Sequence, residues 1–201
     1  KKKTLGHFGW KANQPNLRQQ NAGAAVGDIG IATSLAGGQN CTAAQTDCTN
    51  AINGGAPEMS DEFLEKLTLY TMTIAVPAQR NAGEPAVKHG EELFRTMGCA
   101  SCHMPTLQTK SVERFPELSN QTFHPFTDLL LHDMGDGLAD NRPDFEASGQ
   151  EWRTPPLWGL RTRDRLMHDG LALTRNDAIV RHGGQAAGAA GRYRTLPLNQ
   201  K

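Results

Sequence analysis

The sequence predicts a mainly α-helical fold with long loops, and three observations support this prediction. Several stretches combine helix start and stop signals with apolar residues at helical spacing. No section is rich in the alternating pattern that is typical of strands. Glycine (21) and proline (11) are frequent among the 201 residues, whereas aromatic residues make up only 6%. Such a chain has many turns and a small aromatic core, so we expect it to pack around something other than its own side chains.

The first clear helix is predicted over residues 60–76. Ser60 is a typical N-cap residue, and Pro77 stops the helix. Apolar residues recur between them at Phe63, Leu64, Leu67, Tyr70, Met72 and Ile74. Residues 1–56 are rich in glycine and alanine and show little periodicity. We therefore divide the chain into residues 1–56, a connecting helix within 57–84, and a C-terminal domain over 85–201.

Two shorter helices are predicted in the C-terminal domain. Residues 85–97 have apolar positions on one face and end before Gly98. Residues 174–182 begin at Thr174, an N-cap residue, and end at His182 before two glycines. A histidine in the last turn of a helix is either functional or a surface residue that the helix dipole favours.

The charge composition gives no sign of a nucleic-acid or membrane partner. Lysine plus arginine and aspartate plus glutamate each number 21. A chain without net charge has no general attraction to nucleic acid or to an anionic lipid surface. No apolar run approaches the roughly 20 residues of a membrane span, and no signal peptide is visible. We expect a soluble protein.

The four cysteines form two close pairs. Cys41 and Cys48 lie in a polar stretch without a histidine or acidic cluster suited to a metal. A local disulfide would hold this loop together and would require an oxidising compartment. Two free surface thiols are the alternative.

The second pair, Cys99 and Cys102, is followed directly by His103. Two residues between the thiols match the separation of the two vinyl groups of haem, and the adjacent histidine reaches the iron from the same side. A zinc site would need two more ligands at paired spacing, and a thioredoxin-like dithiol would need a βαβ surrounding. The pentapeptide therefore predicts one covalently attached haem c and a cytochrome c-like haem domain over 85–201.

A haem iron with one protein ligand needs a second ligand or keeps an open face for chemistry. His182 is one candidate for the second ligand. His132 and His168 are each followed by aspartate, which either orients the imidazole or caps a turn. Met134 and Met167 are further candidates, although methionine is more often a core residue.

Four blocks of the sequence resemble the di-haem oxidoreductases, a family once labelled thiol oxidoreductase. The family is distantly similar to bacterial di-haem cytochrome c peroxidases and to MauG. The blocks are FTDLLLHDMG at 126–135, GLAD at 137–140, EWRTPPLWG at 151–159 and HDG at 168–170. The resemblance runs from about Leu5 to Gly184. It implies a protein with peroxidase-like activity. Haem electron transfer in the periplasm or outside a bacterial cell is expected because covalent haem attachment and disulfides both occur there.

The resemblance also implies roles for single residues. His182 falls at the position of an axial ligand, which implies a low-spin iron with His103 and His182 as its two ligands. Trp10 matches a tryptophan between the two haems, and Gln20 matches a glutamine at the distal face of the other haem. For Trp10, a core aromatic at a domain junction is the alternative. An acidic residue of that distal pocket has no clean counterpart, because the matching position is Gly30.

Thr154 and Pro156 match positions at which related enzymes hold a calcium ion with main-chain oxygens. A rigid extended turn made by the two prolines is the plainer interpretation of this segment. The resemblance therefore adds calcium to haem as an expected cofactor, with the turn as the alternative.

The family has two haem attachment sequences, whereas this chain contains one. We therefore expect the C-terminal part of a longer protein, with the end of an upstream haem domain in residues 1–56. A truncated or naturally split member is the alternative. The expected partners are that second haem domain and a small electron donor or acceptor protein. The missing haem would be the reactive centre, and this chain would exchange electrons with it through Trp10. A pure electron carrier and a structural module with a redox-silent haem are the alternative functions.

Overall fold

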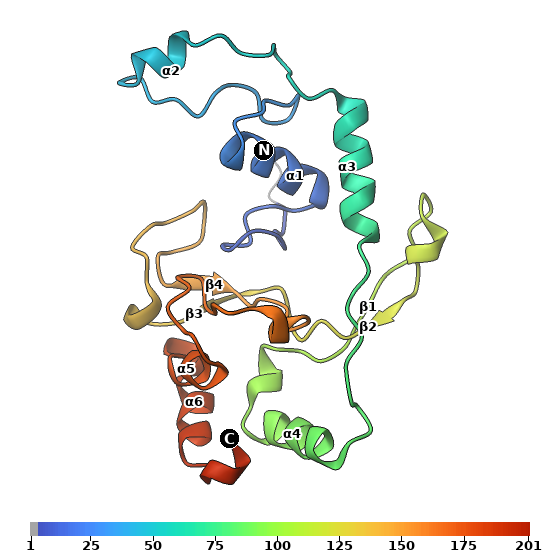
Figure 1. Cartoon of the computed structure of the whole chain (residues 1–201), viewed down its shortest axis with the longest axis vertical. Coiled ribbons are helices and arrows are strands. Elements are labelled where there is room, and N and C mark those ends of the chain that lie inside the picture. Colours follow the sequence, from blue (N-terminus) through green and yellow to red (C-terminus); the bar gives the residue numbers. More distant parts are fainter. Residues whose placement is uncertain (1–3) are drawn as a thin grey trace. The chain divides into compact units, whose positions relative to one another are not determined.

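The computed structural model describes residues 4–201, and Figure 1 shows its ribbon. The chain is 37% helical and 8% strand, which confirms the prediction that no sheet dominates the fold. The helices are α1 (Leu17–Asp28), α2 (Thr46–Asn50), α3 (Asp61–Thr73), α4 (Pro85–Thr96), α5 (Arg175–Val180) and α6 (Ala187–Arg194). The strands are β1 (Leu107–Gln108), β2 (Thr122–Phe123), β3 (Leu131–Asp133) and β4 (Glu151–Arg153).

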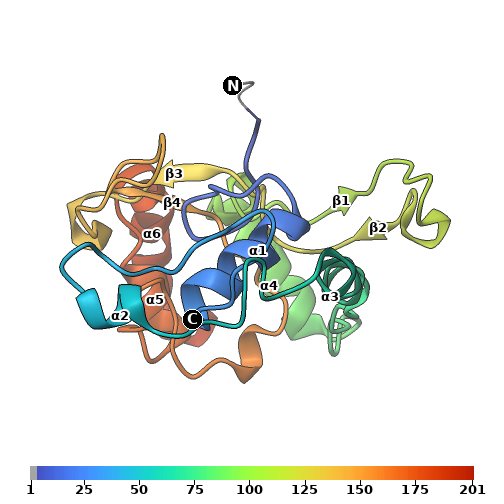
Figure 2. The same ribbon diagram turned by 90° about the horizontal axis from the view of Figure 1, so that it is seen from above.

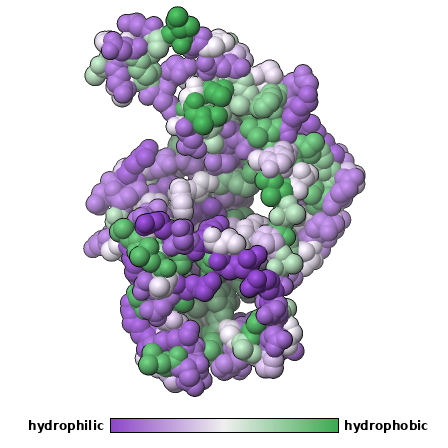
Figure 3. Space-filling view, in the orientation of Figure 1, coloured by the Kyte–Doolittle hydropathy of each residue, from purple (hydrophilic) through white to green (hydrophobic). Residues whose placement is uncertain are grey.

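The chain forms two compact units. The first contains the residues up to Gly9 together with Asn13–Ala75, and the second contains Trp10–Ala12 together with Val76–Lys201. No helix within residues 4–201 is long and apolar enough to cross a membrane. The face drawn in Figure 3 is largely hydrophilic, with small apolar patches scattered over it.

The first unit is built on the pair α1 and α3. The helix predicted over 60–76 is confirmed, although it ends at Thr73, and the Ser60 hydroxyl accepts the Phe63 N–H as an N-cap. Leu64 is fully buried against the small residues Ala22 and Ala25 of α1. Small side chains let the two helices approach closely, so burial of Leu64 stabilises the pair, and the ion pairs of Arg18 with Asp61 and Glu65 also join the two helices.

The loop between α1 and α3 is organised by one carboxylate. Glu58 accepts the backbone N–H of Ala32 at 2.8 Å and that of Gly54 at 2.7 Å. These two bonds lower the pKa of Glu58, because they stabilise the charged form. A single side chain thus fixes two distant points of a loop that has no apolar core of its own.

The second unit contains α4, α5, α6 and two short antiparallel ladders. The pair β1 and β2 forms a hairpin arm that projects from the unit in both Figure 1 and Figure 2. In the other ladder, β3 pairs with β4 so that His132 lies opposite Trp152. The helices predicted over 85–97 and 174–182 are confirmed as α4 and α5, and the Thr174 hydroxyl caps α5 by accepting the Asp177 N–H.

A close backbone contact connects the segment after α5 to β3. A Cβ atom on Gly183 would lie 2.7 Å from the Met134 carbonyl oxygen, and one on Gly184 would lie 2.6 Å from the Gly135 nitrogen. Only glycine permits this approach. The seam of Gly183 and Gly184 against residues 133–135 therefore fixes the chain directly after His182.

Candidate functional site

The two cysteines of the pentapeptide lie on one turn at the end of α4. Gly98 ends the helix in the left-handed region with φ 84°, and the 3-10 turn Cys99–Ser101 follows. The His103 N–H donates to the Cys99 carbonyl at 3.0 Å, which brings the histidine back toward the first cysteine. Both cysteines are half-buried and outside any disulfide. Burial raises the pKa of both thiols, so both are protonated at neutral pH.

His103 presents one nitrogen for coordination. Its Nδ1 lies 2.9 Å from the Phe126 carbonyl oxygen, to which the neutral ring donates its proton. Burial lowers the pKa of His103, and the bond to Phe126 acts in the opposite direction. The neutral tautomer leaves a lone pair on Nε2, as in the histidine ligands of metal proteins. The Phe94 ring packs beside this imidazole, and the Phe126 ring packs edge-on against Phe94.

His182 has the same hydrogen-bond arrangement. Its Nδ1 lies 2.7 Å from the Ala178 carbonyl oxygen in α5, which again leaves Nε2 without its proton. The ring centroids of His103 and His182 are 6.4 Å apart. Two imidazoles bound to one metal ion through nitrogens at about 2.0 Å have centroids about 6 Å apart. The distance and the two free Nε2 atoms therefore fit a haem iron between the rings.

Cys102 lies beside a histidine–carboxylate pair. The Cys102 Sγ is 3.8 Å from His132 Nδ1, and His132 Nε2 is 2.8 Å from an Asp128 carboxylate oxygen. The Gln185 side-chain oxygen lies 3.0 Å from the same Nδ1. The sequence analysis missed Asp128 and Gln185. The only local signal was the spacing of four residues between Asp128 and His132.

The aspartates that follow His132 and His168 cap turns, which confirms one of the two alternatives. The Asp133 carboxylate accepts the Gly135 N–H at 2.7 Å, and that of Asp169 accepts the Leu171 N–H at 3.0 Å. Orientation of His132 comes instead from Asp128, four residues earlier.

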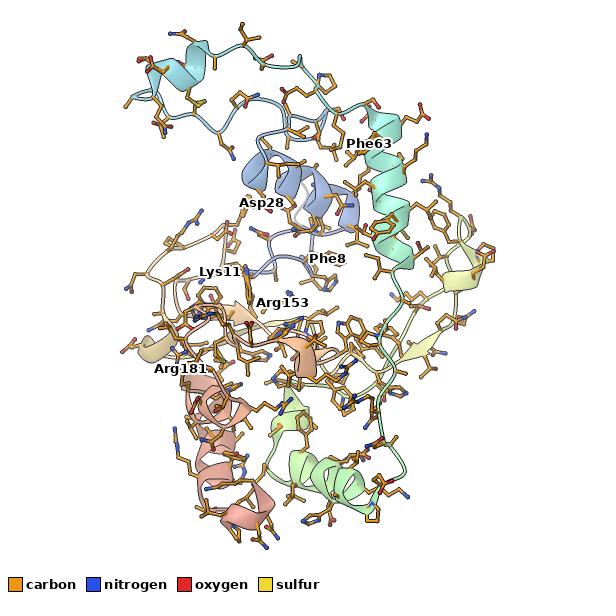
Figure 4. All side chains as sticks on the ribbon, in the orientation of Figure 1. Phe8, Lys11, Asp28, Phe63, Arg153 and Arg181 are labelled. Carbon is orange, nitrogen blue, oxygen red and sulfur yellow. A yellow bond between two sulfur atoms is a disulfide. The ribbon has the colours of Figure 1, made fainter. Side chains whose placement is uncertain are left out.

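His168 lies away from the pair of candidate ligands, in a stack on Trp152. The two ring centroids are 3.5 Å apart and the rings are nearly parallel, at 14°. The Lys11 ammonium lies 3.7 Å from the Trp152 ring centroid. Lys11 also donates to Asp140 and to the carbonyls of Ser148 and Gly149, at 2.9 to 3.2 Å. Figure 4 shows the Lys11 side chain directed toward β4. This stack anchors residues 10–12 to the second unit.

Trp10 and Gln20 lie in different units. The Trp10 carbonyl accepts the Arg153 N–H at 2.9 Å, and its indole is 55% exposed. Gln20 lies in α1 of the first unit, and its buried Oε1 has no hydrogen-bond partner among residues 4–201. The structure thus gives no single unit that contains both residues.

The Thr154 carbonyl oxygen does not fit a calcium ligand in this structure. It accepts the Thr127 hydroxyl at 2.6 Å and the Arg153 guanidinium at 3.2 Å. Two donors occupy the lone pairs that a calcium ion would need, and one of the donors is itself a cation. These contacts favour the rigid turn as the role of Thr154 and Pro156.

The chain also matches a known protein family. Residues 2–201 match the family described as "Di-haem oxidoreductase, putative peroxidase". The chain belongs to this di-haem oxidoreductase family. Membership confirms the resemblance seen in the sequence. It also implies haem as the cofactor.

The other comparisons add little to the family assignment of this di-haem oxidoreductase. No curated protein matches the chain. A solved structure of Kuenenia stuttgartiensis hydrazine synthase, pressurized with xenon, is 21% identical with a TM-score of 0.42. The match covers 67% of this chain and 56% of the other. A similarity of this size supports no statement on fold or function.

Proposed function

We propose that this chain transfers electrons through one haem c, attached by Cys99 and Cys102, with His103 and His182 as axial ligands. The observation that carries the proposal is the histidine pair. Both Nδ1 atoms lie within hydrogen-bond distance of carbonyl oxygens, and the ring centroids are 6.4 Å apart. Family membership supports haem as the group between them. A cytochrome c-like haem domain over 85–201 is part of the proposal.

The histidine ligands and their hydrogen bonds would lower the reduction potential of the iron. Haem supplies a one-electron couple when it is bound. A carbonyl that accepts the Nδ1 proton makes the imidazole a stronger donor, which favours the oxidised iron. Two nitrogen ligands also give a lower potential than a histidine–methionine pair. With His103 and His182 as its two protein ligands, the iron would have no open site for a substrate, which supports a role in electron transfer.

In the complete protein, we propose that a second haem domain carries the peroxidase-like chemistry. The family name supports a second haem. Trp10 is the proposed relay between the haems, since its backbone is bonded to β4 and its indole is exposed. A small redox protein in the periplasm, or outside the cell, would exchange electrons with the pair. The alternative is a pure electron carrier in which both irons are six-coordinate.

The axial assignment is tested by His182→Ala in the purified haem protein. We expect the haem of this chain to change from low spin to high spin in the oxidised absorption and electron paramagnetic resonance spectra. His124→Ala is the matched control, because His124 is exposed and bonded to Thr106. Unchanged low-spin spectra in His182→Ala would refute the assignment. An intact mass without covalent haem would refute the whole proposal.

A disulfide between Cys41 and Cys48 supports the proposed compartment. Their Cα atoms are 5.8 Å apart, within the usual range for a disulfide. We expect both thiols to resist alkylation in the native protein and to react after reduction, as measured by peptide mass. Ready labelling before reduction would remove this argument for an oxidising compartment.

A further inference from the structure

Asn53 and Gly54 form the only asparagine–glycine pair in the sequence, and both residues are exposed. They lie in the loop between α2 and α3, which Glu58 organises. A glycine after an asparagine has no side chain to hinder attack of its backbone nitrogen on the asparagine side chain. The product of this attack is a five-membered succinimide ring, the intermediate of deamidation. The groups around the pair determine whether the fold slows or accelerates this reaction.

A carboxylate contacts the proton that must leave the attacking nitrogen. The Gly54 N–H donates to Glu58 Oε1 at 2.7 Å, a distance at which a general base can act. A Cβ atom on Gly54 would lie 3.1 Å from the same oxygen, so the missing side chain also gives the carboxylate room. Glu58 therefore occupies the position of a base for the Gly54 nitrogen.

A second N–H contacts the oxygen that becomes negatively charged during the attack. The Gly55 N–H donates to Asn53 Oδ1 at 3.1 Å. As the ring closes, this carbonyl oxygen takes up negative charge, and a fixed donor at such a distance stabilises it. The same bond restricts the Asn53 side chain, which reduces the entropy lost when the ring forms.

Glu58 is held in place by contacts other than the one to Gly54. Its backbone N–H donates to the Ala32 carbonyl at 3.0 Å, and the Ala32 N–H donates to its Oε2 at 2.8 Å. The Gln39 side-chain nitrogen donates to the same Oε2 at 3.4 Å. These bonds fix both the main chain and the carboxylate of Glu58, and they leave Oε1 for Gly54.

We propose that Asn53 is a self-modification site, at which the chain catalyses its own deamidation to aspartate and isoaspartate. Glu58 is the base that accepts the Gly54 amide proton, and the Gly55 N–H stabilises the oxyanion on Asn53. The two groups act on opposite partners of the same new bond, the nitrogen and the carbonyl carbon. The inference does not depend on haem.

The reaction balances with water as the only co-reactant. Glu58 takes the proton from the Gly54 nitrogen while that nitrogen bonds to Asn53 Cγ. The bond between Cγ and the side-chain nitrogen then breaks, and the side-chain nitrogen leaves as ammonia with the proton from Glu58. A water molecule opens the ring at either carbonyl, which gives aspartate or isoaspartate. No atom is oxidised or reduced.

The modification acts on the loop that Glu58 organises. Ring closure removes the Gly54 proton, so Glu58 loses one of its backbone N–H partners. After hydrolysis, a new carboxylate at position 53 repels that of Glu58, and isoaspartate adds one carbon atom to the main chain. The bond between Glu58 and Ala32 then remains as the contact of this carboxylate with a backbone N–H.

The test compares the deamidation rate of Asn53 in the native haem protein with the rate in the same protein unfolded in urea. Samples are taken over time at neutral pH, and chromatography with peptide mass gives the aspartate and isoaspartate fractions. We expect the native rate to exceed the unfolded rate by at least about tenfold, because a general base contributes about 100-fold or more. The unfolded chain is the limit of a flexible loop, so flexibility alone cannot produce such a ratio.

Glu58→Gln is the matched variant, because glutamine keeps the size of the side chain but is neutral and a much weaker base. We expect its ratio of native to unfolded rate to fall to about one, since the base is lost. In urea the wild type and Glu58→Gln should react at the same rate. Gly54→Ala is the second variant if Glu58→Gln does not fold. It keeps the bond between Glu58 and Ala32, and its added Cβ displaces Glu58 Oε1, so its ratio should also fall to about one.

Two outcomes would overturn the proposal. A native rate equal to or below the unfolded rate in the wild type would show that the loop protects Asn53. A ratio in Glu58→Gln as high as in the wild type would show that the carboxylate is not the base. Asn81 is an internal reference for the incubation, because it is exposed but is followed by Ala82. Its native rate should not exceed its unfolded rate in any of these proteins.

Discussion

The interior of each of the two units is stabilised by a different kind of contact. The first has a compact apolar cluster in which fully buried Leu64 meets Ala22, Ala25 and Met59. In the second, the buried apolar residues are Leu138, Ala147, Leu166, Ala172 and Ala190, which are scattered along the chain. The aromatic pair beside His103 is only half-buried. The first unit therefore combines side-chain burial between two helices with the ion pairs of Arg18 to Asp61 and Glu65, whereas the second depends on backbone contacts, polar contacts and the site itself.

The largest expected effect lies in the first unit. Leu64→Ala removes the side chain at the centre of the apolar cluster, and we expect it to lower the free energy of unfolding by about 2–5 kcal/mol. Leu69→Ala is the control on the same helix, because Leu69 is 42% exposed. Denaturant unfolding measures both. An equal small effect of the two substitutions would contradict the view that one leucine holds this unit.

Leu64→Ala also tests whether the two units are independent. The candidate haem site lies entirely in the second unit, so the absorption spectrum of the haem should not change with this substitution. A spectrum that changes together with loss of the first unit would show that the two units share one folding transition.

A smaller effect is expected in the second unit from a buried hydroxyl. Thr127 is fully buried; its hydroxyl donates to the Thr154 carbonyl at 2.6 Å and accepts the Leu129 N–H at 2.9 Å. Thr127→Val leaves the Thr154 carbonyl and the Leu129 N–H without the Thr127 hydroxyl, which should lower the free energy of unfolding by about 1–3 kcal/mol. Thr127→Ser keeps the hydroxyl and should recover most of the loss. Thermal unfolding measures the stability of the two variants. Equal stability of Thr127→Val and Thr127→Ser would contradict the view that polar contacts stabilise this unit.

The smallest effect is the pH dependence of one ion pair. The Arg181 guanidinium donates to both Asp169 oxygens and lowers the pKa of that carboxyl to about 2. Because this pKa is below its ordinary value, the stabilisation is present above about pH 4 and is lost as the pH falls toward 2. Solvent screening limits it to about 1 kcal/mol or less. Unfolding of Asp169→Asn between pH 2 and 5 should show a flatter pH profile than the wild type.

The helices could be predicted because their signals are local. Ser60 and Thr174 cap their own helices, and Gly98 ends α4 through its own φ, so a few neighbouring residues determine each boundary. The attachment pentapeptide is equally local. The helix pattern made His182 one candidate among several, and the resemblance selected it, since its helix alone also fits a surface histidine.

The remaining features depend on contacts between distant residues. Strands of two or three residues are too short for a periodicity to appear in the sequence. Lys11 is buried on Trp152 across a separation that no local pattern encodes. Gln185 reaches His132 only because the backbone folds back at the glycine seam. Sequence reasoning therefore named the two candidate iron ligands but missed Asp128 and Gln185, which contact His132 beside the second cysteine.

The glycine seam also determines how the site tolerates mutation. Gly183 and Gly184 carry no functional group, yet any side chain at either position would meet backbone atoms of residues 133–135. A library of all single substitutions, selected for intact haem ligation, would therefore lose variants at these two positions about as strongly as at His182. Selection for the ligand would then also be visible at two positions that supply no ligand atom.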